Sequence, residues 1–186
     1  MSQNNIQEEN RRQAFTKDDA YQSLSMINTW ISNIDTKISF ALALVGVLIG
    51  IIFSTGLPDA LQRVGKVSKL SELYGGEIIA AVLVCLLYIA SFLSILYFML
   101  AIIARVKNLN NTPSIYFFGS ISVMDLQDYK YKVNNMTEQE IIEDLEEQIH
   151  TNSKICNEKA KCYNRGIKFL LVTIILWFIC MTFRLI

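Results

Sequence analysis

The fold is decided by residues 137–183, TEQEIIEDLEEQIHTNSKICNEKAKCYNRGIKFLLVTIILWFICMTF, which join a charged segment to an uncharged one with no obvious break. Thr137 followed by Glu140 is a capping box motif, which predicts that a helix begins here. Residues 138–168 carry one apolar stripe at helical spacing, and Phe169–Phe183 contains no charge. We therefore expect a helix of about 70 Å, half in water and half in lipid.

Composition places the chain among small integral membrane proteins. Of its 186 residues 52% are hydrophobic, which is too apolar for an ordinary soluble domain of this size. Lys+Arg and Asp+Glu balance at 17 each, so no basic excess indicates a nucleic-acid polymer as partner. The four cysteines show no paired Cys-x-x-Cys motifs, which indicates reduced packing residues rather than a metal site.

The predicted fold class is an all-α membrane protein with three transmembrane helices and cytosolic helical stalks. Apolar runs give the spans; Gly-Leu-Pro at 56–58 ends the first one, and Gly-Gly at 75–76 closes the loop that follows it. The expected order is a frayed N-terminus (1–19), a cytosolic amphipathic helix (20–37), the first span (38–54), an extracytoplasmic loop (55–77), the second span (78–104), a cytosolic aromatic connection (105–136), a cytosolic amphipathic helix (137–168) and the third span (169–183).

The sequence does not decide what two of the predicted surfaces pack against. Apolar residues from Ala20 to Ile38 recur with a 4-3-4-3-4 spacing, which predicts a seam that packs either on the 142–163 helix of the same chain or on another copy. In the first span, Gly46 and Gly50 form a small-residue face that lets another helix approach closely. That face serves packing within the chain or a homo-oligomer equally well.

The distribution of basic residues predicts the orientation in the membrane. Eight flank one side and four flank the other; the first set is Lys37, Arg105, Lys107, Lys154, Lys159, Lys161, Arg165 and Lys168, and the second is Arg63, Lys66, Lys69 and Arg184. We therefore expect the N-terminus and residues 105–168 in the cytoplasm and the C-terminus outside.

The connection before the long helix contains an unusual aromatic run. Tyr116, Phe117 and Phe118 precede Gly119 in an otherwise polar segment. One interpretation is an aromatic anchor at the level of the lipid headgroups. The other is a ligand wall, in which the rings stack on a base and Gly119 lets backbone amides approach a phosphate.

No enzyme mechanism is visible in the sequence. The single histidine, His150, lies in the middle of the charged helix, where a solvated surface position explains it. No glycine-rich phosphate loop or nucleophile elbow occurs, and the interiors of the three spans contain no ionisable residue. We predict a protein without catalytic activity, metal or cofactor.

The segment leading into the first span, Ile34-Asp35-Thr36-Lys37-Ile38-Ser39, resembles the Asp-x-Lys-Ala-Ser pattern of the transmembrane effectors of bacterial pyrimidine-cyclase antiphage (Pycsar) systems. Phe117-Phe118-Gly119 after the second span, Tyr129 and the lysine-rich approach to the last span around Lys159 follow the same layout. The resemblance covers roughly residues 30–185. Ile38 departs from it, because the family tends to carry alanine there.

This resemblance implies an antiphage effector of the bacterial inner membrane. It would sense a cyclic pyrimidine nucleotide, cyclic UMP or cyclic CMP, made by a partner nucleotide cyclase, and would then disrupt the membrane as a homo-oligomer. Under this hypothesis Tyr116, Phe117, Phe118 and Gly119 border the nucleotide, and Lys132 or Lys159 meets the phosphate. Asp35, Lys37 and Gly166 would form the hinge between the cytosolic helices and the spans.

Two rival functions remain compatible with the sequence. A constitutive structural or adaptor membrane protein would use the helix seams to bind a partner helix, with the aromatic run as an anchor only. A lysis-type membrane toxin would act without any cyclase. Both rivals share the predicted fold with the effector and differ from it because no nucleotide controls them.

Overall fold

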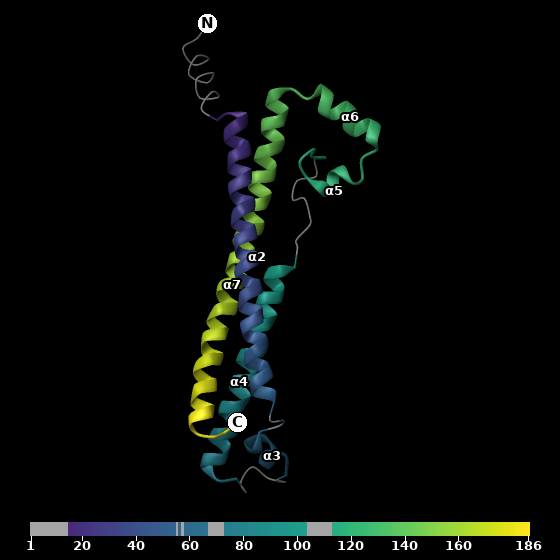
Figure 1. Cartoon of the computed structure of the whole chain (residues 1–186). Helices are drawn as coiled ribbons and strands as arrows, with labels where there is room; N and C mark the ends of the chain where they lie inside the picture. Colours follow the sequence, from purple (N-terminus) through teal and green to yellow (C-terminus); the bar gives the residue numbers. More distant parts are fainter. Residues whose placement is uncertain (1–14, 55, 57, 67–72, 104–112) are drawn as a thin grey trace. The chain divides into compact units, whose positions relative to one another are not determined.

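The computed structural model in Figure 1 describes residues 15–54, 56, 58–66, 73–103 and 113–186. Every regular element in these ranges is a helix, and three helices, α2, α4 and α7, are long and apolar enough to cross a membrane. This confirms the predicted all-α class with three candidate spans. Residues 1–14 of the predicted frayed N-terminus lie outside the described residues, as do Ala104 of the predicted second span and the basic residues Lys69, Arg105 and Lys107.

The three long helices begin at residues that satisfy free amides of the first turn. In α7 (Glu138–Thr182) the capping box forms, because the Thr137 amide donates to Glu140 Oε2 at 2.7 Å and the Glu140 amide donates to Thr137 Oγ1 at 3.3 Å. A similar pair, Thr16 and Asp19, starts α2 (Lys17–Phe53). At α4 (Gly75–Ile102) the Tyr74 amide donates to Glu77.

Three short helices are the other helical elements of the described residues. They are α3 (Asp59–Lys66) between the first two long helices, and α5 (Phe118–Ile121) and α6 (Leu126–Asn135) before α7. The Asp125 side chain caps α6 by accepting from the Gln127 amide. The predicted aromatic connection thus contains two helices that the sequence analysis did not anticipate.

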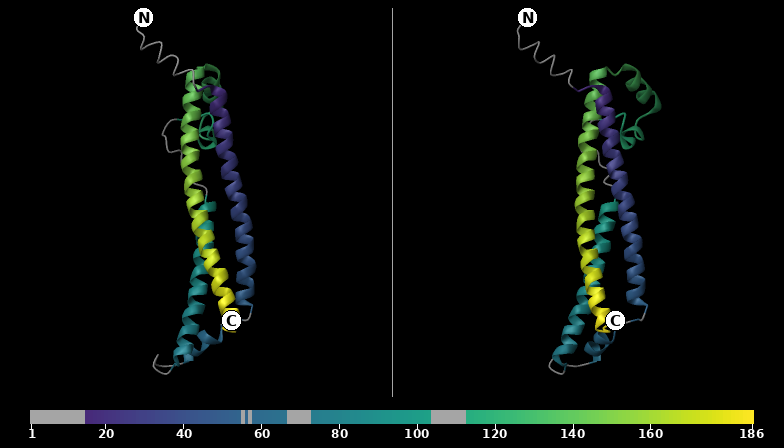
Figure 2. Two further views of the ribbon diagram at one scale, coloured as in Figure 1. Left: turned by 90° about the vertical axis from the view of Figure 1, so that its left-hand side faces the viewer. Right: turned by 60° about the vertical axis from the view of Figure 1, so that its left-hand side comes forward.

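The chain divides into two compact units, which α2 and α7 both enter. The first, called the polar unit here, contains residues up to Asn33 and residues 104–158; the second, the membrane unit, contains residues 34–103 and 159–186. Figures 1 and 2 colour both units by sequence. Each unit has its own buried core.

In the polar unit, the N-terminal part of α2 packs beside the N-terminal part of α7. Ala20 and Ile27 of the predicted seam are buried, and Leu145 of α7 is fully buried. Asn152, the polar exception in the α7 stripe, donates from its side-chain amide to Asn28 Oδ1 of α2 at 3.0 Å. The seam therefore packs on α7 of the same chain within this unit.

The membrane unit has two hydrophobic clusters. One gathers residues of all three long helices around Ile38, Val45 and Phe98, with Tyr163 and Ile167 packed against it. The other contains Ile52, Val84, Leu87 and Cys180, and Leu61 of α3 packs against it. Large apolar side chains such as Phe40, Phe92 and Ile175 are exposed in the chain, as expected for helix faces that meet lipid.

Candidate functional site

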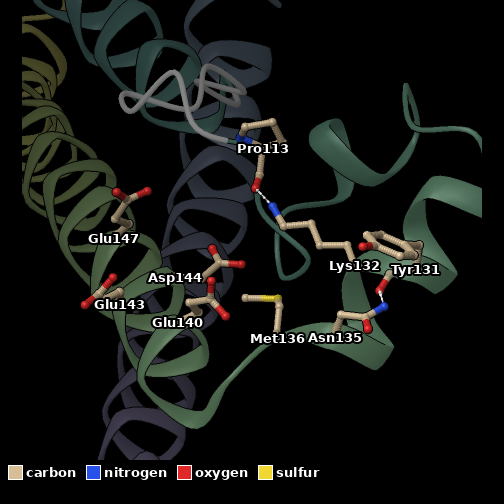
Figure 3. Close-up of a pocket in the computed structure, with 9 residues that line it drawn as sticks. All are labelled: Pro113, Tyr131, Lys132, Asn135, Met136, Glu140, Glu143, Asp144 and Glu147. Carbon is tan, nitrogen blue, oxygen red and sulfur yellow. Dashed lines mark hydrogen bonds between the residues drawn. The ribbon is translucent and has the colours of Figure 1, made fainter.

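A cavity of about 600 Å³ lies in the polar unit between α6 and α7. Spacing on α7 explains one wall, because Glu140, Asp144 and Glu147 follow at four and three residues and so share one helix face. Figure 3 shows these carboxylates opposite the side chains of α6. The residues that line the cavity are Pro113, Tyr131, Lys132, Asn135, Met136, Glu140, Glu143, Asp144 and Glu147.

The cavity carries an excess of negative charge. Among the described residues that line it, four are acids and Lys132 alone is basic. Hydrogen bonds from the Thr137 amide and the Thr137 hydroxyl hold the pKa of Glu140 below its usual value. The Glu140 carboxylate thus stays ionised at neutral pH, and an anionic ligand is tolerated in this acidic cavity only where Lys132 neutralises it.

Lys132 and Asp144 tie the loop before α5 to the two helices. The Lys132 ammonium donates to the Pro113 carbonyl, as Figure 3 shows, and the Ile115 amide donates to Asp144 Oδ2 at 2.9 Å. Lys132, a predicted phosphate ligand, therefore lies in the cavity with its ammonium engaged by a carbonyl. An incoming phosphate would have to compete with that carbonyl or share the ammonium with it.

Tyr116, the first predicted aromatic ligand, lies against α2. Its hydroxyl is 2.6 Å from that of Tyr21, and the two rings meet edge to face at 5.7 Å. Burial, and then the hydrogen bond with Tyr21, raise the pKa of Tyr116 well above its ordinary value of 10.0. The phenol stays neutral at physiological pH and joins the loop to α2.

Removing this hydroxyl pair should loosen the loop. In a Tyr21→Phe variant the Tyr116 hydroxyl loses its partner, at a cost of about 0.5–1.5 kcal/mol, and hydrogen exchange of residues 113–121 should accelerate. Since the folded-state pKa of Tyr116 is raised, its contribution is present below pH 10.0 and is lost only as the pH rises through the folded-state pKa. Tyr131→Phe, at a 72% exposed position, is the control; equal exchange in both variants would contradict the anchoring role.

The remaining predicted aromatic residues lie at the start of α5. The rings of Phe117 and Phe118 are tilted with centroids 5.1 Å apart, and the Phe118 side chain is 67% exposed. A Cβ atom at Gly119 would lie 2.5 Å from Cε1 of Phe117, so the glycine makes room for this ring. None of the three is among the residues that line the cavity. Their role toward a ligand stays a prediction.

The other predicted site residues belong to the membrane unit. Lys159, the second predicted phosphate ligand, pairs with Asp35, a predicted hinge residue, at 2.6 Å. Lys37 is exposed, and α7 continues through Gly166 without a break. Gly46 and Gly50 are exposed with nothing within 4 Å of an added Cβ, so none of the described helices packs closely against their face.

Sequence reasoning missed residues that the structure places at central contacts. Tyr21 and Asp144 hold the loop, and Phe98 fills the space beside Gly166. A tyrosine on the edge of the 20–38 seam and an acid inside a charged helix carry no distinguishing local signal. Phe98 stood among many apolar residues of the second span, so only contacts between distant segments identify it.

The polar unit also buries polar atoms that lack partners. Gln148 Nε2 and Thr151 Oγ1, on α7, make no hydrogen bond within the part of the chain that the structure describes. Each such atom costs about 1–3 kcal/mol. Packing at this level of the polar unit is therefore less favourable than an apolar core would be.

The sequence matches known proteins along most of its length. Residues 19–186 match the model of a family described as the Pycsar effector protein domain. The Pycsar effector protein GmPycTM of Gulbenkiania mobilis is 34% identical over 194 aligned positions, which cover 94% of this chain and 96% of the relative. No solved structure matches the chain. The matched residues include both units.

Proposed function

Because the chain belongs to the Pycsar effector protein family, a membrane family of antiphage defence, we propose that it senses a cyclic pyrimidine nucleotide and then disrupts the bacterial inner membrane. The family membership confirms the resemblance read from residues 34–39 and 117–119. A pyrimidine nucleotide cyclase would supply the ligand. The N-terminus and residues 105–168 would face the cytoplasm and the C-terminus the outside, as the basic residues predict.

The observation that carries the proposal is the continuity of two helices. Both α2 and α7 belong to the polar unit at one end and to the membrane unit at the other. A ligand that prefers one packing of these helices in the polar unit would bias their packing in the bilayer as well. Gln148 Nε2 and Thr151 Oγ1, which lack a hydrogen bond among the described residues, favour this idea, because a different packing can relieve the cost of burying them unpaired.

The cavity is the proposed nucleotide site within the polar unit. Its volume of about 600 Å³ falls in the range of ordinary small-ligand pockets. Lys132 would bind the phosphate after exchanging its contact with the Pro113 carbonyl. That exchange would release the loop before α5, residues 113–117, from α6, which gives ligand binding a direct structural consequence. Tyr116, Phe117 and Phe118 follow directly in the chain and do not line the cavity, so they would border the base only after this release brings them to it.

The test is nucleotide binding to the purified full-length protein. We expect calorimetry to detect cyclic UMP or cyclic CMP, and a Lys132→Met variant to bind about tenfold to a hundredfold more weakly, as for the loss of one charged hydrogen bond. Lys130→Met, an exposed lysine of the same helix that does not line the cavity, is the matched control. If neither nucleotide binds to the unmodified protein, the proposal is refuted. Toxicity in cells that lack the cyclase would instead favour a lysis-type toxin.

We further propose that Gly46 and Gly50 form the contact between copies of the chain. Their exposed, unoccupied face allows close approach of another helix. A Gly46→Ile variant should shift the detergent-solubilised protein toward monomers in mass photometry and reduce depolarisation of cells. Val47→Ile, at a neighbouring position that is 61% exposed, should leave both unchanged. An unaltered oligomer in the Gly46→Ile variant would exclude this face.

A further inference from the structure

A second cavity, of about 280 Å³, lies in the membrane unit between α3 and the first half of α4. The described side chains that line it are hydrocarbon apart from the Cys85 thiol. The principal lining residues are Leu61 and Val64 of α3 and Ile78, Val82, Cys85 and Leu86 of α4. Water finds no hydrogen-bond partners among such side chains, so an apolar occupant is favoured.

The α4 wall is continuous with the surface that faces lipid. Residues 78, 82, 85 and 86 recur at helical spacing and form one stripe along about 12 Å of the helix axis. Val82 is 51% exposed and Leu86 is 47% exposed within the chain. Because α4 is a candidate span, a hydrocarbon chain of the bilayer can enter the cavity along this stripe without crossing water.

Helix α3 forms a fixed opposite wall. Leu61 packs against the cluster of Ile52 and Val84, and Arg63 pairs with Glu77 of α4 at 2.8 Å. This places the Val64 side chain over α4, where it lines the cavity. The contact of α3 with α4 therefore shapes a site that either helix alone would lack.

Charge identifies the headgroup end of the occupant. Arg63 and Lys66 both lie in the last turn of α3, one and two residues from Val64 in the sequence, and Arg63 is paired with Glu77. Basic side chains next to an apolar wall at a span's end are the combination that binds a phospholipid, with its chains in the apolar part and its phosphate on the cations. We propose that this cavity holds one acyl chain of a membrane phospholipid, with the phosphate beside Lys66. The site is independent of the nucleotide.

Native mass spectrometry of the full chain released from nanodiscs of phosphatidylethanolamine and phosphatidylglycerol tests this site. One retained phospholipid per chain is expected. Val82→Trp, which fills the cavity, should reduce that adduct at least about tenfold, the factor for displacing two methylenes. Ile79→Trp, also exposed on α4 but outside the cavity, should keep the adduct. Equal adducts in the two variants, or no adduct with the unmodified chain, would overturn the proposal.

A second measurement needs no substitution in the cavity. Phosphatidylglycerol with a photoreactive group in its acyl chain should label Cys85 and Leu86 saturably as its fraction in the membrane rises. Labelling of Ile175, an exposed residue of α7, should rise in proportion to that fraction. Proportional labelling at both places would show ordinary bilayer contact and overturn the site. If a Lys66→Gln variant retained phospholipid to the same extent as the unmodified chain, Lys66 would not be part of the site.

Discussion

Replacing Gly166 with alanine is expected to destabilise the membrane unit by about 1–2 kcal/mol, because overpacking a core costs about 1–3 kcal/mol and better helix propensity returns at most about 1 kcal/mol. A Cβ atom there would lie 2.6 Å from Cε1 of Phe98. Phe98 is fully buried and its neighbour Ser94 donates to the Gly166 carbonyl at 3.1 Å, so the ring has little room to move. Titration with SDS in mixed micelles measures the change.

The same substitution separates two roles of Gly166. If the glycine serves packing, a Phe98→Leu replacement should recover part of the stability that Gly166→Ala loses, and a double-mutant cycle should show coupling between the two positions. If the glycine is the predicted hinge, Gly166→Ala should weaken the response to nucleotide and leave stability unchanged. Additive effects of the two substitutions would contradict the packing role.

The long helices were predictable because each carries a signal of its own. Each signal depends on residues that are close together in the sequence. The signals are the capping box at Thr137, the apolar stripe of α7 and the uncharged runs of the spans. Local signals of this kind lead directly from sequence to helix. Helices α5 and α6 were missed because four and ten residues are too few to show a helical period.

The contacts of the candidate site were less predictable, because they join distant parts of the chain. Tyr21 and Tyr116 are 95 residues apart, and Asp35 and Lys159 are 124 apart. The sequence presents Lys132 and Lys159 as equivalent lysines near polar helices. The structure places Lys132 in the cavity of the polar unit and pairs Lys159 with Asp35 in the membrane unit. What a lysine binds is decided by neighbours that its local sequence does not reveal.

The ion pair between Asp35 and Lys159 should respond unequally to loss of its two partners. The Lys159 side chain is 11% exposed, whereas that of Asp35 is 42% exposed. Asp35→Asn leaves a largely buried ammonium without its carboxylate, and we expect a loss of about 1–2 kcal/mol, a charged hydrogen bond reduced for the exposure of Asp35. Lys159→Met places an apolar chain of similar length in the same space and leaves a carboxylate that water can reach, so its cost should be smaller.

Combining the two substitutions tests the cause of this asymmetry. The double variant Asp35→Asn/Lys159→Met should be more stable than Asp35→Asn alone, since it removes the unpaired ammonium, and Lys37→Met at an exposed position of the same helix is the control. Equal losses from either single substitution would contradict the argument from burial. Nucleotide affinity adds an independent result. Because Asp35 already neutralises Lys159, this lysine is not expected to bind the phosphate. Lys159→Met should therefore leave nucleotide affinity unchanged, whereas Lys132→Met should lower it. If Lys159→Met lowered nucleotide affinity and Lys132→Met did not, Lys159 would be the phosphate ligand, and its ion pair with Asp35 would have to open when the nucleotide binds.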